Sequence, residues 1–161
     1  MQIRLKFWFL RQYWWLLLLV FVLLAGGIVV VGPGLDLRLL LTLLGSVLSL
    51  VYFLQRQRLE ELKLFREIFT DCNARYDRLN EELNAIVDEP VDEPLSCCQQ
   101  QILMDYFNLC GEEYLHYSQG YLFPEVWRAW HNGMQYFVRN PRVAGVWSEE
   151  KKTDSYYGLP L

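Results

Sequence analysis

The chain has 161 residues, of which 53% are hydrophobic and 16% aromatic, and its formal net charge is −4. Between residues 13 and 54 only Asp36 and Arg38 are charged. This excludes a simple soluble globule, because two apolar stretches of nearly membrane-crossing length follow one another. Residues 1–66 carry a net charge of +5 and residues 67–161 a net charge of −9. The acidic second part argues against a nucleic-acid-binding surface, so no direct binding to nucleic acid is expected.

Two membrane-spanning helices are predicted, over residues 13–31 and 39–54, with the Gly32-Pro33-Gly34 break between them. Backbone groups in hydrocarbon have no water to bond, so each stretch must satisfy its own hydrogen bonds as a helix. The short connection predicts a helical hairpin. We therefore expect an all-α membrane protein, with a transmembrane hairpin over residues 1–54 and a cytoplasmic all-α domain over residues 55–161.

The orientation of the hairpin follows from the basic residues near its ends, because Lys and Arg are enriched on the cytoplasmic side of a membrane. Arg38 is the only basic residue in the connection between the two stretches. The basic residues beyond the outer ends are Arg4, Lys6, Arg11, Arg56, Arg58, Lys63 and Arg66. We expect a two-pass protein of the cell inner membrane with both termini cytoplasmic, and membrane lipid as a partner.

The second apolar stretch carries a stripe of small, weakly polar residues. They recur three and four positions apart and are Thr42, Gly45, Ser46 and Ser49. Small side chains let membrane helices approach closely, and this close packing drives their association in lipid. Two interpretations stay open: the stripe packs within the hairpin of one chain, or it faces other subunits or a pore.

No proline interrupts residues 35–89, so the second membrane helix is predicted to continue into the cytoplasm. It is predicted to end at an exposed turn over residues 87–94, which contains acidic residues and prolines. Beyond residue 54, after a first step of three, apolar residues recur at gaps that alternate between three and four, as in a coiled-coil-like seam. The seam consists of Leu59, Leu62, Phe65, Phe69, Cys72, Tyr76, Leu79, Leu83 and Ile86. It packs either against helices of the same chain or against a second copy. Cys72 and Tyr76 suit a dimeric zipper poorly, which favours packing within the chain.

Residues that start and end helices divide the rest of the chain. Ser96 can cap a helix that stops at Gly120. Pro124 suits the first turn of another helix, which the Asn140-Pro141 pair ends. Residues 143–147 are expected to form a short turn before a polar tail. These helices are predicted to pack against the long helix as a small bundle.

Five short segments of the C-terminal part carry a resemblance. They are Tyr106–Tyr114, Gly120–Trp127, Trp130, Gly133-Met134 and Ser155–Leu159. Through these segments, the part of the chain from about residue 100 to residue 159 resembles a family of uncharacterised bacterial proteins. The proteins of this family have an N-terminal membrane anchor and a small cytoplasmic helical domain. The resemblance implies no catalytic residue. The plan of a two-helix hairpin with a small domain is also similar to that of membrane effectors of bacterial anti-phage systems, a likeness of architecture alone.

The cysteines and histidines lack the spacing of a metal site. Zinc ligands usually come in pairs with a few intervening residues, whereas Cys97 and Cys98 are adjacent and no second pair exists. We therefore expect no metal, no cofactor and no catalytic residue, and the chain is predicted not to be an enzyme. Cys98 and Cys110 are expected to be small core residues.

The adjacent acids Glu112 and Glu113 allow two interpretations. Both are solvated, as acidic pairs usually are, or one of them is a buried partner of Arg128 that fixes the register of the bundle.

Aromatic residues are dense in the C-terminal part of the chain. About half of them must belong to the core. The others can form a docking surface, because Tyr and Trp are enriched at the centres of protein interfaces. The candidates for this surface are Tyr121, Trp127, Trp130 and Trp147.

The sequence supports two functional hypotheses. In the first, a non-enzymatic, oligomeric inner-membrane protein perturbs or gates the membrane in response to a cytoplasmic signal, and the architectural resemblance suggests anti-phage defence as the setting. In the second, the hairpin is an inert anchor whose helical domain recruits a cytosolic protein complex. The expected partners are membrane lipid, further copies of the chain and a cytosolic protein.

Overall fold

The computed structural model describes residues 37–161 together with residues 15, 21, 22 and 26. Most of the predicted first membrane helix, residues 13–31, lies outside the described residues, and so does the Gly32-Pro33-Gly34 connection. The chain divides into two compact units, Met1–Lys63 and Leu64–Leu161.

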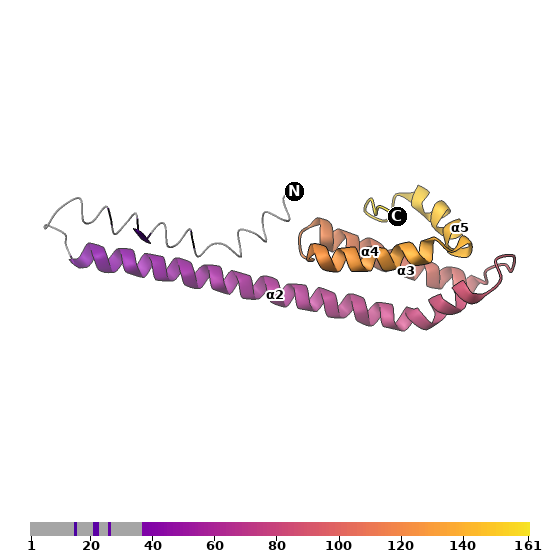
Figure 1. The fold of residues 1–161 in the computed structure, drawn as a ribbon, viewed down its shortest axis with the longest axis horizontal. Helices are drawn as coiled ribbons and strands as arrows, with labels where there is room; N and C mark the ends of the chain where they lie inside the picture. Colours follow the sequence, from indigo (N-terminus) through magenta and orange to yellow (C-terminus); the bar gives the residue numbers. More distant parts are fainter. Residues whose placement is uncertain (1–14, 16–20, 23–25, 27–36) are drawn as a thin grey trace. The chain divides into compact units, whose positions relative to one another are not determined.

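The described part of the chain is built from helices (Figure 1). In chain order they are α2 (Leu37–Asp88), α3 (Cys97–Ser118), α4 (Pro124–Val138), α5 (Pro141–Glu150) and the short 3-10 helix η1 (Lys151–Thr153). No strand occurs among the residues that the structure describes. The predicted all-α class is confirmed.

Helix α2 is one continuous helix of 52 residues, as the absence of proline predicts. It contributes residues to both compact units. Within the part of the chain that the structure describes, no helix combines the length and the apolar character needed to cross a membrane.

The predicted ends of α3 and α4 are confirmed. The Ser96 side chain accepts a hydrogen bond from the Gln99 backbone, and the Gln99 side chain accepts one from the Ser96 backbone, which together make a capping box. Gly120 follows α3 with a φ of 78°, a left-handed conformation that glycine adopts without steric cost. Pro124 occupies the first turn of α4.

The expected short turn over residues 143–147 is wrong, because this segment belongs to the ten-residue helix α5. The Asn140-Pro141 pair ends α4 and also starts α5. The Asn140 side chain accepts a hydrogen bond from the Arg142 backbone, and Pro141 stands in the first turn, where its missing N–H costs nothing.

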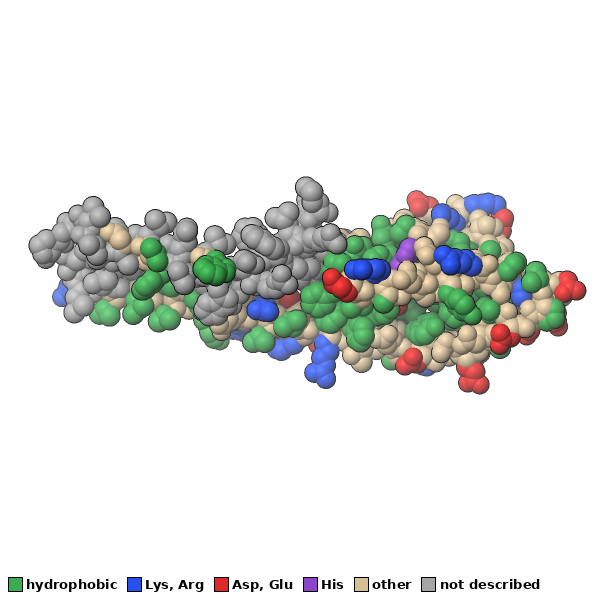
Figure 2. All heavy atoms as spheres, viewed as in Figure 1, with side chains coloured by type: hydrophobic (Ala, Val, Ile, Leu, Met, Phe, Trp, Pro, Cys, Tyr) green, Lys and Arg blue, Asp and Glu red, His purple; other side chains and the backbone are tan. Residues whose placement is uncertain are grey.

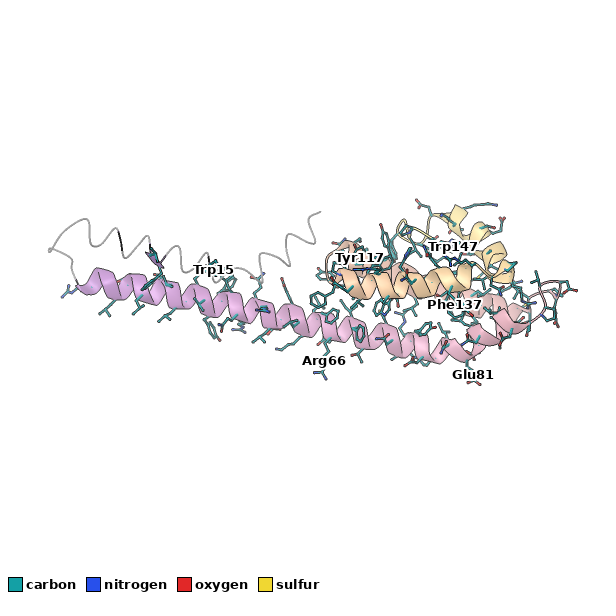
Figure 3. The ribbon with its side chains drawn as sticks, viewed as in Figure 1. Trp15, Arg66, Glu81, Tyr117, Phe137 and Trp147 are labelled. Atoms are coloured by element: carbon teal, nitrogen blue, oxygen red, sulfur yellow. The ribbon has the colours of Figure 1, made fainter. Side chains whose placement is uncertain are left out.

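The second unit, residues 64–161, holds a hydrophobic core to which α2, α3, α4 and α5 all contribute. Figure 1 shows α3 and α4 between the C-terminal half of α2 and α5. In Figure 3, Phe137 and Trp147 lie inside this unit, whereas Arg66 and Glu81 point away from it. The fully buried side chains are Cys72, Leu83, Ile86, Leu103, Phe107, Leu109, Cys110, Leu122 and Val143.

The seam of α2 is packed in the second unit and exposed in the first. In the second unit its members pack against α3 and α4 of the same chain, with Leu83 buried and Tyr76 and Leu79 half-buried. Phe69 is at the margin of this packing and stacks on Trp130, with ring centroids 5.7 Å apart. The remaining seam residues, Leu59 and Leu62, are exposed in the first unit.

Candidate functional site

A cavity of about 560 Å³ lies within the second unit, where α2 and α3 meet the C-terminal tail. Its lining brings together two of the segments that carry the family resemblance, Tyr106–Tyr114 and Ser155–Leu159. The residues that line it are Arg75, Arg78 and Leu79 of α2, Asp105, Asn108, Leu109 and Glu112 of α3, and Ser155, Tyr156 and Tyr157 of the tail. We refer to it as the tail cavity.

Tyr156 anchors the part of the tail that lines this open cavity. Its ring packs against Phe107 and Trp147 in the core, with centroids 6.3 and 5.2 Å away. Its hydroxyl donates a hydrogen bond of 2.7 Å to the Glu150 carboxylate, and burial raises the pKa of Tyr156 to about 12. A residue without a side chain faces it: a β-carbon placed on Gly111 would lie 3.4 Å from the Tyr156 ring.

The backbone on both sides of Tyr156 is left-handed. Asp154 and Tyr157 each have a φ of 55°, and among the described residues they are the only non-glycine residues with positive φ. Such conformations cost of order 1 kcal/mol or more and persist where the surroundings hold them in place, often at functional sites. Here they direct Ser155 and Tyr157 towards the cavity, and Gly158 follows with a φ of 75°.

One wall of the tail cavity is fixed by an ion pair between α2 and α3. The two terminal guanidinium nitrogens of Arg75, Nη1 and Nη2, donate to the Glu112 carboxylate, and the Nη2 bond is 3.1 Å long. The hydrogen bond from Arg75 lowers the pKa of Glu112. The interpretation that pairs one of the two adjacent acids with Arg128 is wrong, because Glu112 pairs with Arg75 and Arg128 is exposed on α4.

The neighbouring carboxyl, that of Glu113, is buried with only 6% of the residue exposed. Burial raises its pKa to about 8, and no hydrogen bond contributes to the shift. The charge of Arg75 opposes this rise and that of Glu112 supports it. Glu113 therefore adds a proton-binding group to the α2–α3 contact, whose protonated form suits its apolar surroundings better than its charged form.

The two buried cysteines, Cys72 and Cys110, lack the accessible, ionised thiol of a nucleophile. Burial raises the pKa of Cys72 to about 12 and that of Cys110 well above its usual value, so both thiols stay protonated and weakly reactive. Cys110 is buried as expected, but the same expectation for Cys98 is wrong: Cys97 and Cys98 are exposed in the first turn of α3, before its first buried residue, Leu103. Within residues 37–161 no group of His, Cys, Asp and Glu residues is arranged to hold a metal ion.

Arg142 joins α5 to the acidic turn, a contact that the sequence analysis did not anticipate. Its side chain is 1% exposed and donates to the Glu89 carboxylate at 2.6 Å and to the Glu93 and Pro90 carbonyl oxygens. Gln99 also donates to the Glu89 carboxylate, at 2.8 Å. The turn is thus held by buried polar contacts, while Val91 at its tip is exposed. Figure 2 shows acidic side chains gathered around this end of the unit.

The four candidate docking aromatics do not form one surface. Trp127 and Trp147 belong to the buried core. Trp130 is half-buried and Tyr121 is exposed. Only the latter two retain surface that a partner can contact.

In the first unit, the small-residue stripe lies on the exposed surface of α2. The Thr42 hydroxyl donates to the Arg38 carbonyl oxygen at 2.8 Å, and the Ser46 hydroxyl donates to the Thr42 carbonyl oxygen at 2.9 Å. Within the described part of the chain, a β-carbon placed on Gly45 would meet no atom within 4 Å. Large apolar side chains of the same segment are exposed as well: Leu41, Leu44, Leu48, Leu50, Tyr52 and Phe53.

Comparison of the chain with protein-family models, with curated proteins and with solved structures finds no match. The family resemblance of about residues 100–159 therefore stays an expectation from the sequence.

Proposed function

We propose that this chain is a non-enzymatic, two-pass protein of the bacterial inner membrane that works as an oligomer. In this proposal the helical unit over residues 64–161 receives a cytoplasmic signal. The N-terminal hairpin, with its second helix over residues 39–54, then perturbs or gates the membrane. Anti-phage defence is the setting that its architectural likeness suggests.

The observation that carries the proposal is that α2 exposes large apolar side chains on opposite sides between residues 41 and 53, where its only polar side chains are the hydroxyls of the stripe and of Tyr52. Leu41 and Leu50 are nine residues apart, which is about two and a half turns at 3.6 residues per turn, so they point to opposite sides of the helix. Both are exposed, as is Phe53 at a further angle. A helix that is hydrophobic all round is expected inside a large core or in a membrane. Figure 2 shows hydrophobic side chains along this part of α2.

An inert anchor that recruits a cytosolic complex is the second candidate, and the hydroxyl groups of the stripe favour it. The hydroxyl groups of Thr42 and Ser46 donate hydrogen bonds to carbonyl groups of their own helix. Such hydroxyls are already satisfied in an apolar environment and do not need to line water. The exposed Tyr121 and the half-buried Trp130 then offer contact area to a recruited partner.

Membrane attachment and orientation are tested together in cells that express the full chain. Attachment requires the chain to remain in the membrane pellet after an alkaline carbonate wash, and its release would overturn the proposal. Cys97 and Cys98 are natural reporters of orientation, because both are exposed whereas Cys72 and Cys110 are buried. An impermeant thiol reagent should label the chain only after the cells are permeabilised. Labelling of intact cells would place the helical unit outside.

The effector and the anchor differ in their effect on membrane potential. We expect the full chain, expressed with its native neighbours and triggered by phage, to depolarise cells as reported by a potential-sensitive dye. Selectivity needs rings of charge or ordered carbonyl groups, and residues 39–54 hold no charged side chain, so the leak should not prefer one ion. A steady potential during a full biological response would leave the anchor as the function.

A further inference from the structure

We propose that the tail cavity is a binding site for a small zwitterion, a free amino acid or a short peptide, whose carboxylate binds Arg78 and whose ammonium group binds Asp105. This inference goes beyond the proposed function and does not depend on membrane insertion. It is argued from the size of the cavity, from its charges and from the tail that lines one side of it.

The size of the cavity suits a ligand of this class. Its volume of about 560 Å³ lies within the range of roughly 300–1,000 Å³ typical of small-molecule sites. A tripeptide in extended conformation is about 10 Å long, so its two ends can reach different walls. Leu79 and Leu109 supply apolar lining, and the exposed ring of Tyr157 stands at the tail side.

The charges of the cavity are balanced, which disfavours a simple anion or cation. Arg75 and Glu112 neutralise each other through two hydrogen bonds. Arg78 forms no ion pair within 4.0 Å with any residue from 37 to 161. Asp105 uses one carboxylate oxygen to accept a hydrogen bond from Gln101 at 2.9 Å. One cation and one anion are thus available on different helices, Arg78 on α2 and Asp105 on α3.

A ligand with one negative and one positive group satisfies both residues. The planar guanidinium of Arg78 matches a carboxylate with two parallel hydrogen bonds. A multiply charged anion is disfavoured, because residues 67–161 carry a net charge of −9 and two acids line the cavity itself. The Asn108 amide, which is both donor and acceptor, lies in the same lining and suits a peptide group.

The C-terminal tail forms one side of the cavity. Its two left-handed, non-glycine residues, Asp154 and Tyr157, flank the two tail residues Ser155 and Tyr156 in the cavity lining. The core holds the buried ring of Tyr156, which packs on Phe107 and Trp147, and also Leu159, to which the chain returns through a turn over Tyr157 and Gly158. This turn leaves Tyr157 exposed beside the cavity, where a ligand can pack against its ring.

The test is titration calorimetry of the full chain, purified in detergent, with three probes. They are tri-alanine, N-acetyl-tri-alanine, which lacks the ammonium group, and tri-alanine amide, which lacks the carboxylate. We expect tri-alanine to bind with a millimolar or lower Kd and each capped form to bind about tenfold more weakly or worse, because each cap removes one charge-assisted contact. Absence of tri-alanine binding, or equal binding of all three probes, would overturn the proposal.

Two variants assign the ends of the ligand. Arg78→Gln should weaken tri-alanine binding about tenfold and abolish the preference for the free carboxylate over the amide. Asp105→Asn should abolish the preference for the free ammonium over the acetylated form. Arg128→Gln changes an exposed arginine of α4 that does not line the cavity, and its Kd should equal that of the unchanged chain. Unaltered preferences in the first two variants would show that the peptide binds elsewhere, which contradicts the proposal.

Discussion

Gly111 of α3 lies directly against Tyr156 of the C-terminal tail, so that a β-carbon on Gly111 would be 3.4 Å from the Tyr156 ring and 3.5 Å from its α-carbon. These distances are ordinary van der Waals contacts, which leave room for one methyl group and for little more. The contact joins two segments that the sequence marks separately, and both of them line the cavity.

The first prediction concerns this contact. Gly111→Ala should be tolerated, whereas Gly111→Leu should lower the free energy of unfolding by about 1–3 kcal/mol, because the larger side chain overpacks the site. Gly133→Leu is the matched control, since a β-carbon on Gly133 of α4 meets nothing within 4 Å. Chemical denaturation followed by tryptophan fluorescence measures all three. Equal loss in both Leu variants would show that the contact does not limit side-chain size.

The second prediction concerns the buried arginine. Arg142→Leu should lower the free energy of unfolding by about 3 kcal/mol, because it leaves Glu89 and two carbonyl groups of the acidic turn without their buried donor. Arg139→Leu, at an exposed position next to α4, should change the free energy of unfolding by about 0.5 kcal/mol or less. If the two variants lose the same stability, the turn is not held by Arg142.

The third prediction is a dependence of stability on pH. Burial raises the pKa of Glu113 from 4.5 to about 8, so the folded chain binds this proton more tightly than the unfolded chain. The free energy of unfolding should therefore fall as the pH rises from about 4.5 to about 8, and then level off. At about 1.4 kcal/mol per pKa unit the total fall is at most about 5 kcal/mol.

The charged and titratable groups around Glu113 do not imitate this effect. The pKa values of Cys72, Tyr76, Tyr106 and Cys110 are all raised, so these groups stay protonated in this range. Glu113→Gln should remove the slope, whereas Glu125→Gln, at an exposed position in the first turn of α4, should keep it. Denaturation of the three chains at several pH values makes the comparison. A slope that survives in Glu113→Gln would assign the effect to another group.

The sequence predicted what is decided locally. Ser96 and Pro124 mark helix starts because their side chains act on the backbone of the next turn, and the structure has helices at both places. It did not predict contacts between distant segments. Glu112 pairs with Arg75, which is 37 residues away, and nothing local distinguishes Arg75 from Arg128 as its partner.

The tail cavity was missed for a related reason. Its shape depends on left-handed backbone at Asp154 and Tyr157, and residues of these types carry no signal as strong as glycine for that conformation. The family-like segments contained the residues that line it, but their spacing in the sequence gives no indication that they meet. Helix α5 was missed because Asn140-Pro141 reads as the end of one helix and equally well as the start of the next.

The last prediction concerns Gly45 in the small-residue stripe. A β-carbon there meets no atom of the described residues within 4 Å, and Leu has a higher helix propensity than Gly, so Gly45→Leu should not disturb the formation of α2 itself. If the stripe is a contact between copies, the added side chain forces the helices apart. We expect a smaller oligomer on native gels with a normal yield in the membrane fraction. Leu50→Phe enlarges an exposed residue on another side of α2 and should leave the oligomer unchanged. An unchanged oligomer in Gly45→Leu as well would mean that the stripe is not a contact between copies, and the contact that holds the oligomer would then have to be sought elsewhere.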